Sequence, residues 1–318
     1  MSVALEGPVA VVGFGHQGEA QALNLRDSGV SVRVGARPGH AAEARARSHG
    51  FEVHDLAIAV RGASVVAVLL PDDVAPTLWG SLHAAMEPAA GLVFAHGYNL
   101  LAGTLSFGDD QPVVLVSPCG PGRVLRQTFE RGEGLPAYLA VHRGDELRGW
   151  RLAEAYATAL GCARARLWRT SVREETEVDL FGEQNVLCGG MNELVVAAWE
   201  TLVEAGYSPE IAYLECVHQL KFLADLLHER GVTGLREGIS GTALHGDLTR
   251  GPRVIGKASR LAMAEALSDI RSGRYAAELA KEVAAGKPAT RAGLEASRRH
   301  PIEAARRRAL GLPETGSP

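Results

Sequence analysis

Cysteines and aromatic residues are scarce in this sequence, and strongly apolar stretches are short. The four cysteines, Cys119, Cys162, Cys188 and Cys216, lie far apart and form neither a C-x-x-C pair nor a disulfide framework, which is typical of reduced thiols in a cytosol. The first residues lack a basic stretch followed by a long apolar one, and no run of about 18 apolar residues is evident. We therefore expect a cytoplasmic protein that does not bind a membrane.

The sequence also lacks a strong excess of charge of either sign. Its net charge is −4 and its pI is near 6.3, so it has no field that would attract a phosphate backbone, and we expect no nucleic-acid partner. The Arg- and Ala-rich segment 291–312 is interrupted by Glu295 and Glu303, which favours a solvated helix over a basic arm. The composition is 46% hydrophobic and 22% charged over 318 residues, as expected for a globular protein of two domains.

The first half alternates short β-branched runs with segments of helical composition. Residues 8–13 (PVAVVG) have the pattern of a strand buried on both faces, a helical segment runs to Gly29, and residues 30–35 resume the strand pattern. Further apolar runs follow at 64–70, 91–95 and 113–116, with the last strand expected near 137–141. The alternation predicts a parallel, doubly wound sheet. The strand pattern stops near residue 170, so we place an α/β domain at 1–170 and an all-helical domain at 171–318.

A G-x-G-x-x-G motif runs from Gly13 to Gly18 and falls at the first junction of strand and helix. Gly13 permits the tight turn, Gly15 lets the backbone approach a pyrophosphate, and Gly18 lets the helix pack closely on the strand. The N–H groups at the start of that helix face the anion. The motif predicts dinucleotide binding. A glycine turn that merely connects the two elements does not explain its position at the first junction.

The residues after the second strand favour NADPH. Residues 35–40 (GARPGH) contain no carboxylate that would hold a ribose 2′-hydroxyl. Arg37, assisted by His40, suits a 2′-phosphate because a guanidinium offers a planar fork of donors. NADH remains the alternative if Arg37 is only a solvated loop residue.

Spaced carboxylates follow in the helical half. Asp179 and Glu183 are four residues apart, so a helix presents both on one face, which suggests a magnesium site or, alternatively, a solvated acidic face. A second predicted helix, 209–229, carries Glu215 and Gln219 at the same interval. Ser240 lies in a small, hydroxyl-bearing segment that suits either a helix start or a ligand-binding loop.

Several long runs together carry a family resemblance. They are GFGHQGEAQALNLRDSG from Gly13, LLPDD from Leu69, FAHGYN from Phe94, EETEVDLFGEQNVLCGG from Glu174, and EAGYSPEIAYLECVHQLK from Glu204. Over nearly its whole length the chain resembles the short form of ketol-acid reductoisomerase, the second enzyme of branched-chain amino-acid biosynthesis. The resemblance implies an N-terminal Rossmann domain, a knotted all-α C-terminal domain, and a homodimer with shared active sites. Assembly beyond a dimer stays open.

The resemblance also implies a reaction. Two magnesium ions polarise a 2-hydroxy-3-keto acid (an acetohydroxy acid), an alkyl group migrates, and NADPH reduces the resulting 2-keto acid. By position, Asp179 would bridge the ions, Glu183 would complete the first site, and Glu215 would reach the second from the other subunit. The implied catalytic residues are His96 beside the nicotinamide, Cys119, Glu183, and Ser240 on the substrate carboxylate. The implied metal ligands are Asp179, Glu183, Glu215 and Gln219. The implied cofactor-binding residues are Gly13, Phe14, Gly15, His16, Gln17, Gly18, Arg37, His40, Leu70, Pro71 and Gly122.

The chain departs from the family at functional positions. Gln219 stands where the family has a metal-binding glutamate, so we expect the second magnesium to bind weakly. Cys119 stands where the family has a lysine, whose cation a thiol cannot replace. Further departures are Gly238 for serine, Leu244 for glutamate, and His40 and Ala42 for two serines. These changes suggest altered substrate or chemistry, such as reduction of a keto acid or imine without alkyl migration. A catalytically silent nucleotide-binding protein is the remaining alternative.

Overall fold

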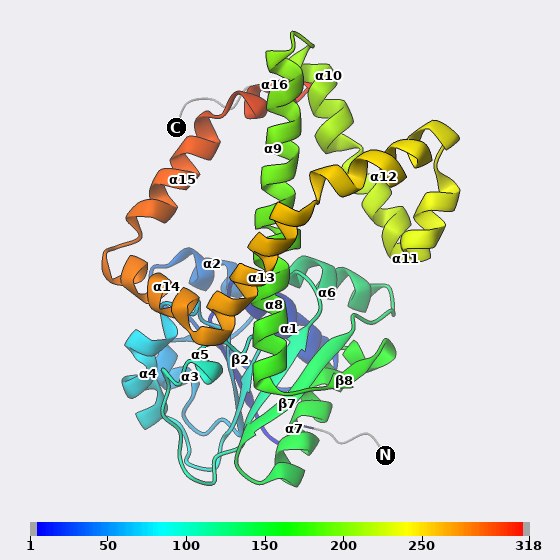
Figure 1. Ribbon diagram of the computed structural model, residues 1–318. Helices are drawn as coiled ribbons and strands as arrows, with labels where there is room; N and C mark the ends of the chain where they lie inside the picture. Colours follow the sequence, from blue (N-terminus) through cyan, green and yellow to red (C-terminus); the bar gives the residue numbers. More distant parts are fainter. Residues whose placement is uncertain (1–4, 314–318) are drawn as a thin grey trace. The chain divides into compact units, whose positions relative to one another are not determined.

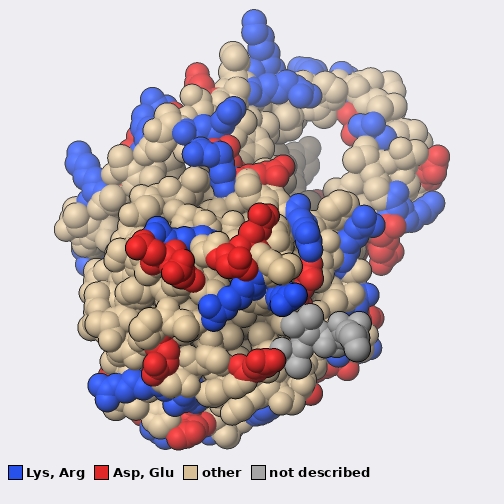
Figure 2. Space-filling view, turned by 90° about the horizontal axis from the view of Figure 1, so that it is seen from below, with Lys and Arg blue, Asp and Glu red and all other residues tan. Residues whose placement is uncertain are grey.

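A computed structural model describes residues 5–313, and the chain divides between Val178 and Asp179 into two compact units. Each unit is described by itself below. Figure 1 shows the helices and strands of both. Acidic and basic side chains are intermixed over most of the face shown in Figure 2, in keeping with the small net charge of −4.

The first unit is built on one eight-stranded sheet in the order β3-β2-β1-β4-β5-β6-β7-β8. The strands are β1 (Val9–Val12), β2 (Val32–Gly35), β3 (Val53–His54), β4 (Val65–Val68), β5 (Gly91–Phe94), β6 (Val113–Pro118), β7 (Ala137–Arg143) and β8 (Leu167–Arg169). The first six are parallel, β7 runs antiparallel to β6, and β8 is parallel to β7. The doubly wound α/β fold is confirmed.

The expectation that the sheet ends near 137–141 was wrong, because β8 adds an edge strand. Its three residues are Leu-Trp-Arg, and Arg166 precedes them. An edge strand does not need an apolar run, since one side of it faces water and charged side chains protect its free edge. The charged composition therefore hid this strand from a search for apolar runs.

Helices cover both faces of this sheet (Figure 1). One face packs against α1 (His16–Asp27), α2 (Ala41–Ser48), α6 (Gly122–Glu130) and α7 (Glu146–Ala159), which bury a cluster containing Val11, Leu25, Leu139 and Tyr156. The other face packs against α3 (Leu56–Ala59), α4 (Ala75–Ala84) and α5 (Tyr98–Leu101), around Val66, Trp79, Leu92 and Leu115. A short 3-10 turn, η1 (Cys162–Arg164), leads into β8. Buried apolar contacts on both faces explain the uninterrupted apolar runs of the central strands.

The second unit is helical throughout its described part, as expected. After α8 (Val172–Gly182) come the π-helix η2 (Glu183–Leu187), α9 (Gly189–Glu204), α10 (Pro209–Tyr213), a second π-helix η3 (Leu214–His218), α11 (Leu220–Gly238), α12 (Gly241–Val254), α13 (Lys257–Ser272), α14 (Arg274–Ala284), α15 (Pro288–Arg299) and α16 (Pro301–Ala309). Trp199, Tyr213 and Ile302 form a small core between α9, α10 and α16. Trp199 Nε1 donates to the Pro209 carbonyl oxygen at 2.9 Å. The implied knot stays a prediction.

Apolar side chains also lie on the surface of this unit. On η2 and α9, Val186, Leu187, Met191 and Leu194 are between 41% and 62% exposed. The continuous helix Val172–Glu204 is long and, on average, apolar enough to cross a membrane by length and composition alone, although polar residues interrupt its apolar run. The same test is passed by helices of soluble proteins, and exposed apolar patches of this kind often mark protein interfaces.

Candidate functional site

The glycine-rich loop has the geometry that a bound pyrophosphate requires. Gly13 has φ +96°, and a Cβ there would lie 2.5 Å from the Leu69 carbonyl oxygen, while a Cβ on Gly18 would lie 2.1 Å from the Gly13 carbonyl oxygen. Gly15 has open space around its Cβ position and precedes α1 without a side-chain cap. The first N–H groups of α1 therefore keep their capacity to donate to an anion, and there is room for it at Gly15.

The end of β6 is fastened to this loop. Gln17 Nε2 donates to the Gly120 carbonyl oxygen at 3.0 Å. A Cβ on Gly122 would lie only 2.0 Å from the His16 carbonyl oxygen, so glycine is required there for α6 to approach the start of α1. The structure thus gives Gly122 a packing role, and its contact with the cofactor stays a prediction. Exposed Cys119 lies at this same end of β6.

A carboxylate that the sequence reasoning missed, Glu43 in the first turn of α2, contacts the loop after β2. Glu43 Oε2 accepts from the Gly39 N–H at 2.7 Å, and Oε1 pairs with Arg47 at 2.9 Å. The Gly39 hydrogen bond and then Arg47 hold the pKa of Glu43 below its ordinary value. His40 caps α2, its Nδ1 accepting from the Ala42 N–H, and Arg37 is exposed. An acidic residue in the first turn of the helix after β2 is the signal in the sequence, and it lies just beyond the segment 35–40 where a ribose-binding carboxylate is expected.

Another arginine, Arg45 of α2, contacts the glycine-rich loop. Arg45 Nη2 donates to the Phe14 carbonyl oxygen at 2.7 Å, and Arg45 Nε lies 3.7 Å from Glu19 Oε2. Arg45 thereby joins α2 to the loop and to α1. The sequence reasoning did not single out Arg45, because its position in the middle of α2 matches no cofactor motif.

His96 at the end of β5 is backed by a buried carboxylate. The Gly97 N–H donates to His96 Nδ1 at 3.0 Å and to Glu175 Oε2 at 3.1 Å, and the two side chains lie 3.7 Å apart. The Glu175 side chain is 1% exposed, and its Oε1 has no hydrogen-bond partner among the described residues. A Cβ on Gly97 would lie 2.1 Å from Thr176 Oγ1, so α8 packs directly on this turn.

Glu175 was missed although its spacing gave a signal. It lies four residues before Asp179, which in turn lies four residues before Glu183. The four-residue rule therefore selects Glu175 as well. Burial was the missing information, since sequence alone does not distinguish a carboxylate under the β5 turn from one in water.

Asp72 follows β4 beside the same histidine. Asn99 Nδ2 donates to Asp72 Oδ1 at 3.0 Å and to the Asp72 carbonyl oxygen at 3.1 Å. Burial raises the pKa of Asp72, and the neighbouring His96 partly offsets this rise. Half-buried Leu70 and exposed Pro71 precede it. His96 is thus near two carboxyl groups, the buried Glu175 and the half-buried Asp72, an arrangement suited to holding and moving a proton.

The four predicted metal ligands form two pairs, each at a π-helix. Asp179 lies in the last turn of α8 and Glu183 begins η2, whereas Glu215 lies in η3 and Gln219 directly follows it. Single π-helical turns are frequent at functional sites. Over residues 5–313, no group of three or more His, Cys, Asp or Glu side chains is placed to hold a metal ion. One chain therefore does not bring the predicted ligands together, although their oxygen donors suit a hard cation.

Ser240 serves as a helix start. It is the N-cap of α12, and its Oγ accepts from the Ala243 N–H at 3.2 Å. Of the two roles that the sequence left open, the structure shows this one. The hydroxyl can still donate its own hydrogen, so contact with a substrate carboxylate stays a prediction.

A doubly wound sheet with a glycine-rich anion loop after β1 and a carboxylate-backed histidine after β5 defines an NAD(P)-dependent oxidoreductase. Residues 5–166 match the family model for the acetohydroxy acid isomeroreductase NADPH-binding domain, and residues 172–310 match that for the ketol-acid reductoisomerase C-terminal domain. An NADH-preferring ketol-acid reductoisomerase from an uncultured archaeon is similar, with 34% identity, 98% of this chain and 96% of that chain covered, and a TM-score of 0.93. The chain belongs to the ketol-acid reductoisomerase family.

More distant structures share the fold alone. A semialdehyde dehydrogenase NAD-binding protein from Cupriavidus necator has 19% identity and a TM-score of 0.63, with 84% of this chain and 99% of that chain covered. Pyrroline carboxylate reductase from Plasmodium falciparum has 12% identity and a TM-score of 0.52, with 85% and 98% covered.

Proposed function

We propose that this chain acts on a short branched 2-hydroxy-3-keto acid, or on the 2-keto acid related to it by alkyl migration, using NADPH and magnesium in the cytoplasm. The observation that carries the proposal is His96, whose Nδ1 lies 3.7 Å from the buried Glu175 carboxylate at the carboxyl edge of the sheet that carries the glycine-rich loop. Ligands of open α/β sheets bind at this edge.

The chain's own residues support a reduction. When bound, the nicotinamide supplies a hydride to the carbonyl carbon of the substrate. Because the Gly97 N–H donates to His96 Nδ1, the neutral imidazole would carry its proton on Nε2, and from that atom it would donate to a substrate oxygen. Glu175 Oε2 accepts from the same Gly97 N–H and lies 3.7 Å from His96 Nδ1.

The donor set also supports magnesium. A bound ion would polarise an oxygen of the substrate as a Lewis acid. Asp179 and Glu183 would hold it from one chain, and Glu215 and the Gln219 amide oxygen from a second copy. The separation of these pairs in one chain and the exposed apolar side chains of η2 and α9 both favour a homodimer. Covering these side chains in the dimer would also account for the apolar helix without a membrane.

Two substrates test the proposal directly. Oxidation of NADPH is followed with magnesium and either 2-acetolactate or 3-hydroxy-3-methyl-2-oxobutyrate, the migrated intermediate. His96→Gln should lower turnover by about 100-fold or more, whereas the matched control His54→Gln, on β3, should not. The proposal fails if neither compound is turned over, or if His96→Gln is as active as the wild type.

Reduction without alkyl migration is the second candidate. Cys119 and Gln219 favour it, because hydride delivery to an activated carbonyl needs less metal charge than migration does. Turnover of 3-hydroxy-3-methyl-2-oxobutyrate alone would establish this candidate. Turnover of 2-acetolactate would rule it out.

A further inference from the structure

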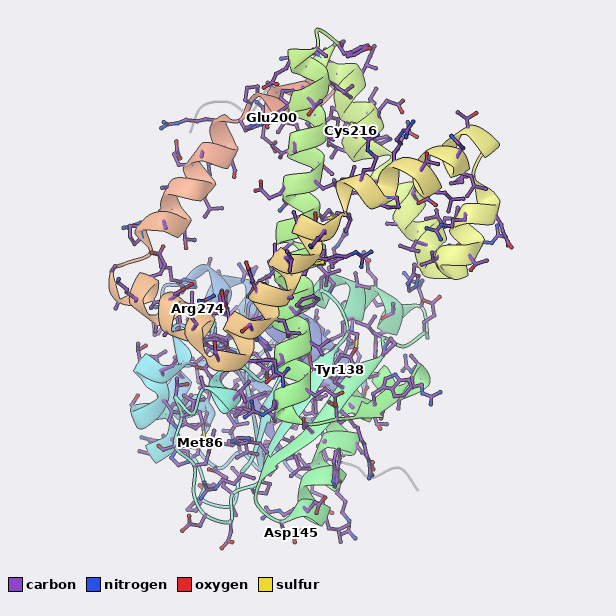
Figure 3. The ribbon with its side chains drawn as sticks, in the orientation of Figure 1. Met86, Tyr138, Asp145, Glu200, Cys216 and Arg274 are labelled. Atoms are coloured by element: carbon purple, nitrogen blue, oxygen red, sulfur yellow. The ribbon has the colours of Figure 1, made fainter. Side chains whose placement is uncertain are left out.

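Three side chains link the interior of the first unit to the turn after β6. The Tyr156 O–H donates to Gln21 Oε1 at 2.9 Å, and Gln21 Nε2 donates to Gln17 Oε1 at 3.2 Å. Gln17 Nε2 in turn donates to the Gly120 carbonyl oxygen at 3.0 Å. Tyr156 lies on α7, the helix that begins beside Asp145, which is labelled in Figure 3. Both glutamines lie on α1, so the hydrogen bonds run from α7 through α1 to the turn.

The inner end of this chain of hydrogen bonds is shielded from water. Tyr156 and Gln21 are both 0% exposed. Burial raises the pKa of Tyr156 well above its ordinary value, and the nearby Cys162 thiol adds a smaller contribution. The tyrosine hydroxyl therefore keeps its proton and remains a hydrogen-bond donor.

The buried Gln21 amide does not satisfy a helix end, in contrast to Asn24 on the same helix. Asn24 is also 0% exposed, and its Nδ2 donates to the Leu160 carbonyl oxygen at 3.1 Å, which lies at the end of α7 and needs a donor. Within residues 5–313, the Gln21 amide bonds to side chains only. Apolar residues of the same shape could replace such a buried pair at little cost. The polarity of Gln21 and Tyr156 is explained if its effect lies farther along, at Gly120.

The Gly120 carbonyl oxygen sets the direction of the whole chain. A carbonyl oxygen only accepts, so the nitrogen of the Gln17 amide must face it. The Gln17 Oε1 atom then faces Gln21 Nε2, and Gln21 Oε1 faces the Tyr156 O–H. Without the tyrosine hydroxyl, nothing at that end favours this orientation of the Gln21 amide. A reversed Gln21 amide would bring two oxygen atoms together at Gln17, so the orientation of each amide depends on the next.

The turn of residues 118–122 borders the loop that is predicted to hold the pyrophosphate. A Cβ on Gly122 would lie 2.0 Å from the His16 carbonyl oxygen, so the turn and the start of α1 are in backbone contact. The first N–H groups of a helix have no intrahelical partner, and α1 has no side-chain cap. Gln17 is the second residue of α1. Its backbone N–H therefore belongs to the anion site, while its side-chain amide holds the turn.

A change in this turn would weaken the binding of an anion. The Gly120 carbonyl group is bonded to Pro121, which has no N–H. This peptide group can offer an anion only its carbonyl oxygen, which is the negative end of its dipole. The Gln17 amide engages that oxygen, and loss of the hydrogen bond would leave it uncompensated beside the pyrophosphate.

We propose that Tyr156 and Gln21 are positioning residues for the nicotinamide cofactor. They orient the Gln17 amide, which holds the turn of residues 118–122 in the conformation that suits the pyrophosphate. Both side chains are fully buried, so neither touches the cofactor. The inference rests on the cofactor of the proposed function and is independent of the substrate.

Binding of NADPH by Tyr156→Phe tests the inference. Calorimetry on the full-length chain, without substrate, compares this variant with the wild type at a temperature where circular dichroism shows both to be folded. Loss of one neutral hydrogen bond predicts a dissociation constant about 3- to 10-fold higher. A role in stability alone predicts a lower melting temperature with unchanged affinity, and that result would overturn the proposal.

Ser28→Ala is the matched control. Ser28 Oγ also donates from α1 to α7, to the Ala159 carbonyl oxygen at 2.7 Å, but Ser28 is at the opposite end of α1 from the glycine-rich loop. Its loss should leave the NADPH dissociation constant within about 2-fold of the wild type. Equal weakening in Ser28→Ala and Tyr156→Phe would show a general loosening of the two helices, and would overturn the proposal. If Tyr156→Phe does not fold, Gln21→Met removes the middle link of the chain and has the same expected outcomes.

A double-mutant cycle with Gln17→Leu tests whether the effect passes through Gln17. Gln17→Leu removes the hydrogen bond to Gly120 and should weaken NADPH binding at least as much as Tyr156→Phe. In the Gln17→Leu background, Tyr156→Phe should then change the dissociation constant by less than about 2-fold. The same fold-change in both backgrounds would mean that Tyr156 acts by another route, contrary to the proposal. A wild type that binds neither NADPH nor NADH refutes the cofactor of the proposed function and this inference with it, whereas tight binding by the wild type and by Tyr156→Phe alike refutes the inference alone.

Discussion

Replacing Gly15 by alanine tests whether the glycine-rich loop binds the cofactor or is only a structural turn. A Cβ on Gly15 meets nothing within 4 Å, and its backbone angles, φ −83° and ψ −160°, suit alanine. Without a ligand, Gly15→Ala should therefore fold as stably as the wild type, or up to about 1 kcal/mol more stably, because alanine restricts the unfolded chain. The open space is where a pyrophosphate would approach the backbone.

The expected loss of NADPH affinity follows from that space. A methyl group there prevents one hydrogen bond from a backbone N–H to a charged phosphate, which contributes about 1.5–3 kcal/mol. The dissociation constant should rise about 10- to 150-fold. At a concentration 100 times the wild-type dissociation constant, NADPH stabilises the wild type by about 2.7 kcal/mol, whereas a variant binding 100-fold more weakly gains about 0.4 kcal/mol. In thermal melts this is a shift of about 5–10 °C against about 1–2 °C.

Gly29→Ala is the control, because Gly29 ends the same helix with φ +83° and has open space around it. It should lower stability by about 1 kcal/mol through backbone strain and leave NADPH affinity intact. If Gly15→Ala binds NADPH as tightly as the wild type, the loop does not hold the pyrophosphate and the cofactor assignment is refuted.

Three further predictions follow from the site. Glu175→Gln should lower kcat about 10- to 100-fold, the value of a hydrogen bond to a charged group, without changing NADPH affinity; unaltered kcat would remove Glu175 from the site. Arg37→Ala should reduce the preference for NADPH over NADH, measured as the ratio of the two kcat/KM values. Glu43→Gln should increase this preference, because it removes a negative charge beside the loop after β2. An increase for Arg37→Ala and a decrease for Glu43→Gln would favour NADH as the cofactor. Because burial raises the pKa of Asp72, its contribution to stability is full below about pH 4 and is lost as pH rises through the folded-state pKa. Asp72→Asn should therefore lose less stability than the wild type between about pH 4 and pH 7 in thermal melts, and parallel curves would contradict this.

The glycine-rich loop was predictable because its residues are dictated by sterics. Gly13 and Gly18 lie where a Cβ would overlap a carbonyl oxygen, so only glycine fits, and that requirement is visible in a sequence. The Glu175 carboxylate was not predictable in the same way. Its role depends on burial under Gly97, which is far away along the chain and comes close only through the packing of α8 on β5.

At the predicted metal-ligand pairs, the spacing of residues does not fix the direction of their side chains. A four-residue interval predicts a shared face only if the helix is regular. Glu183 begins η2 and Glu215 lies within η3, where a π-helical turn changes the angle between successive side chains. The interval selected these segments as candidates, but it could not fix which way their oxygen atoms point.

The backbone contacts of Cys119 and Gln219, the two main departures from the family pattern, explain why the fold tolerates them. Cys119 is held by its own N–H on the Pro136 carbonyl oxygen, and Gln219 by its N–H on the Leu214 carbonyl oxygen, so neither position needs a particular side chain to maintain the backbone. By contrast, Gly13, Gly18, Gly97 and Gly122 lie where any larger residue would overlap a neighbour. Relative to the residues that the resemblance implies, cysteine for lysine removes one positive charge, while Gln219 and Leu244, each for glutamate, remove two negative charges. Substitution at Cys119 and Gln219 therefore leaves the fold intact, whereas substitution at any of these glycines would disturb the packing.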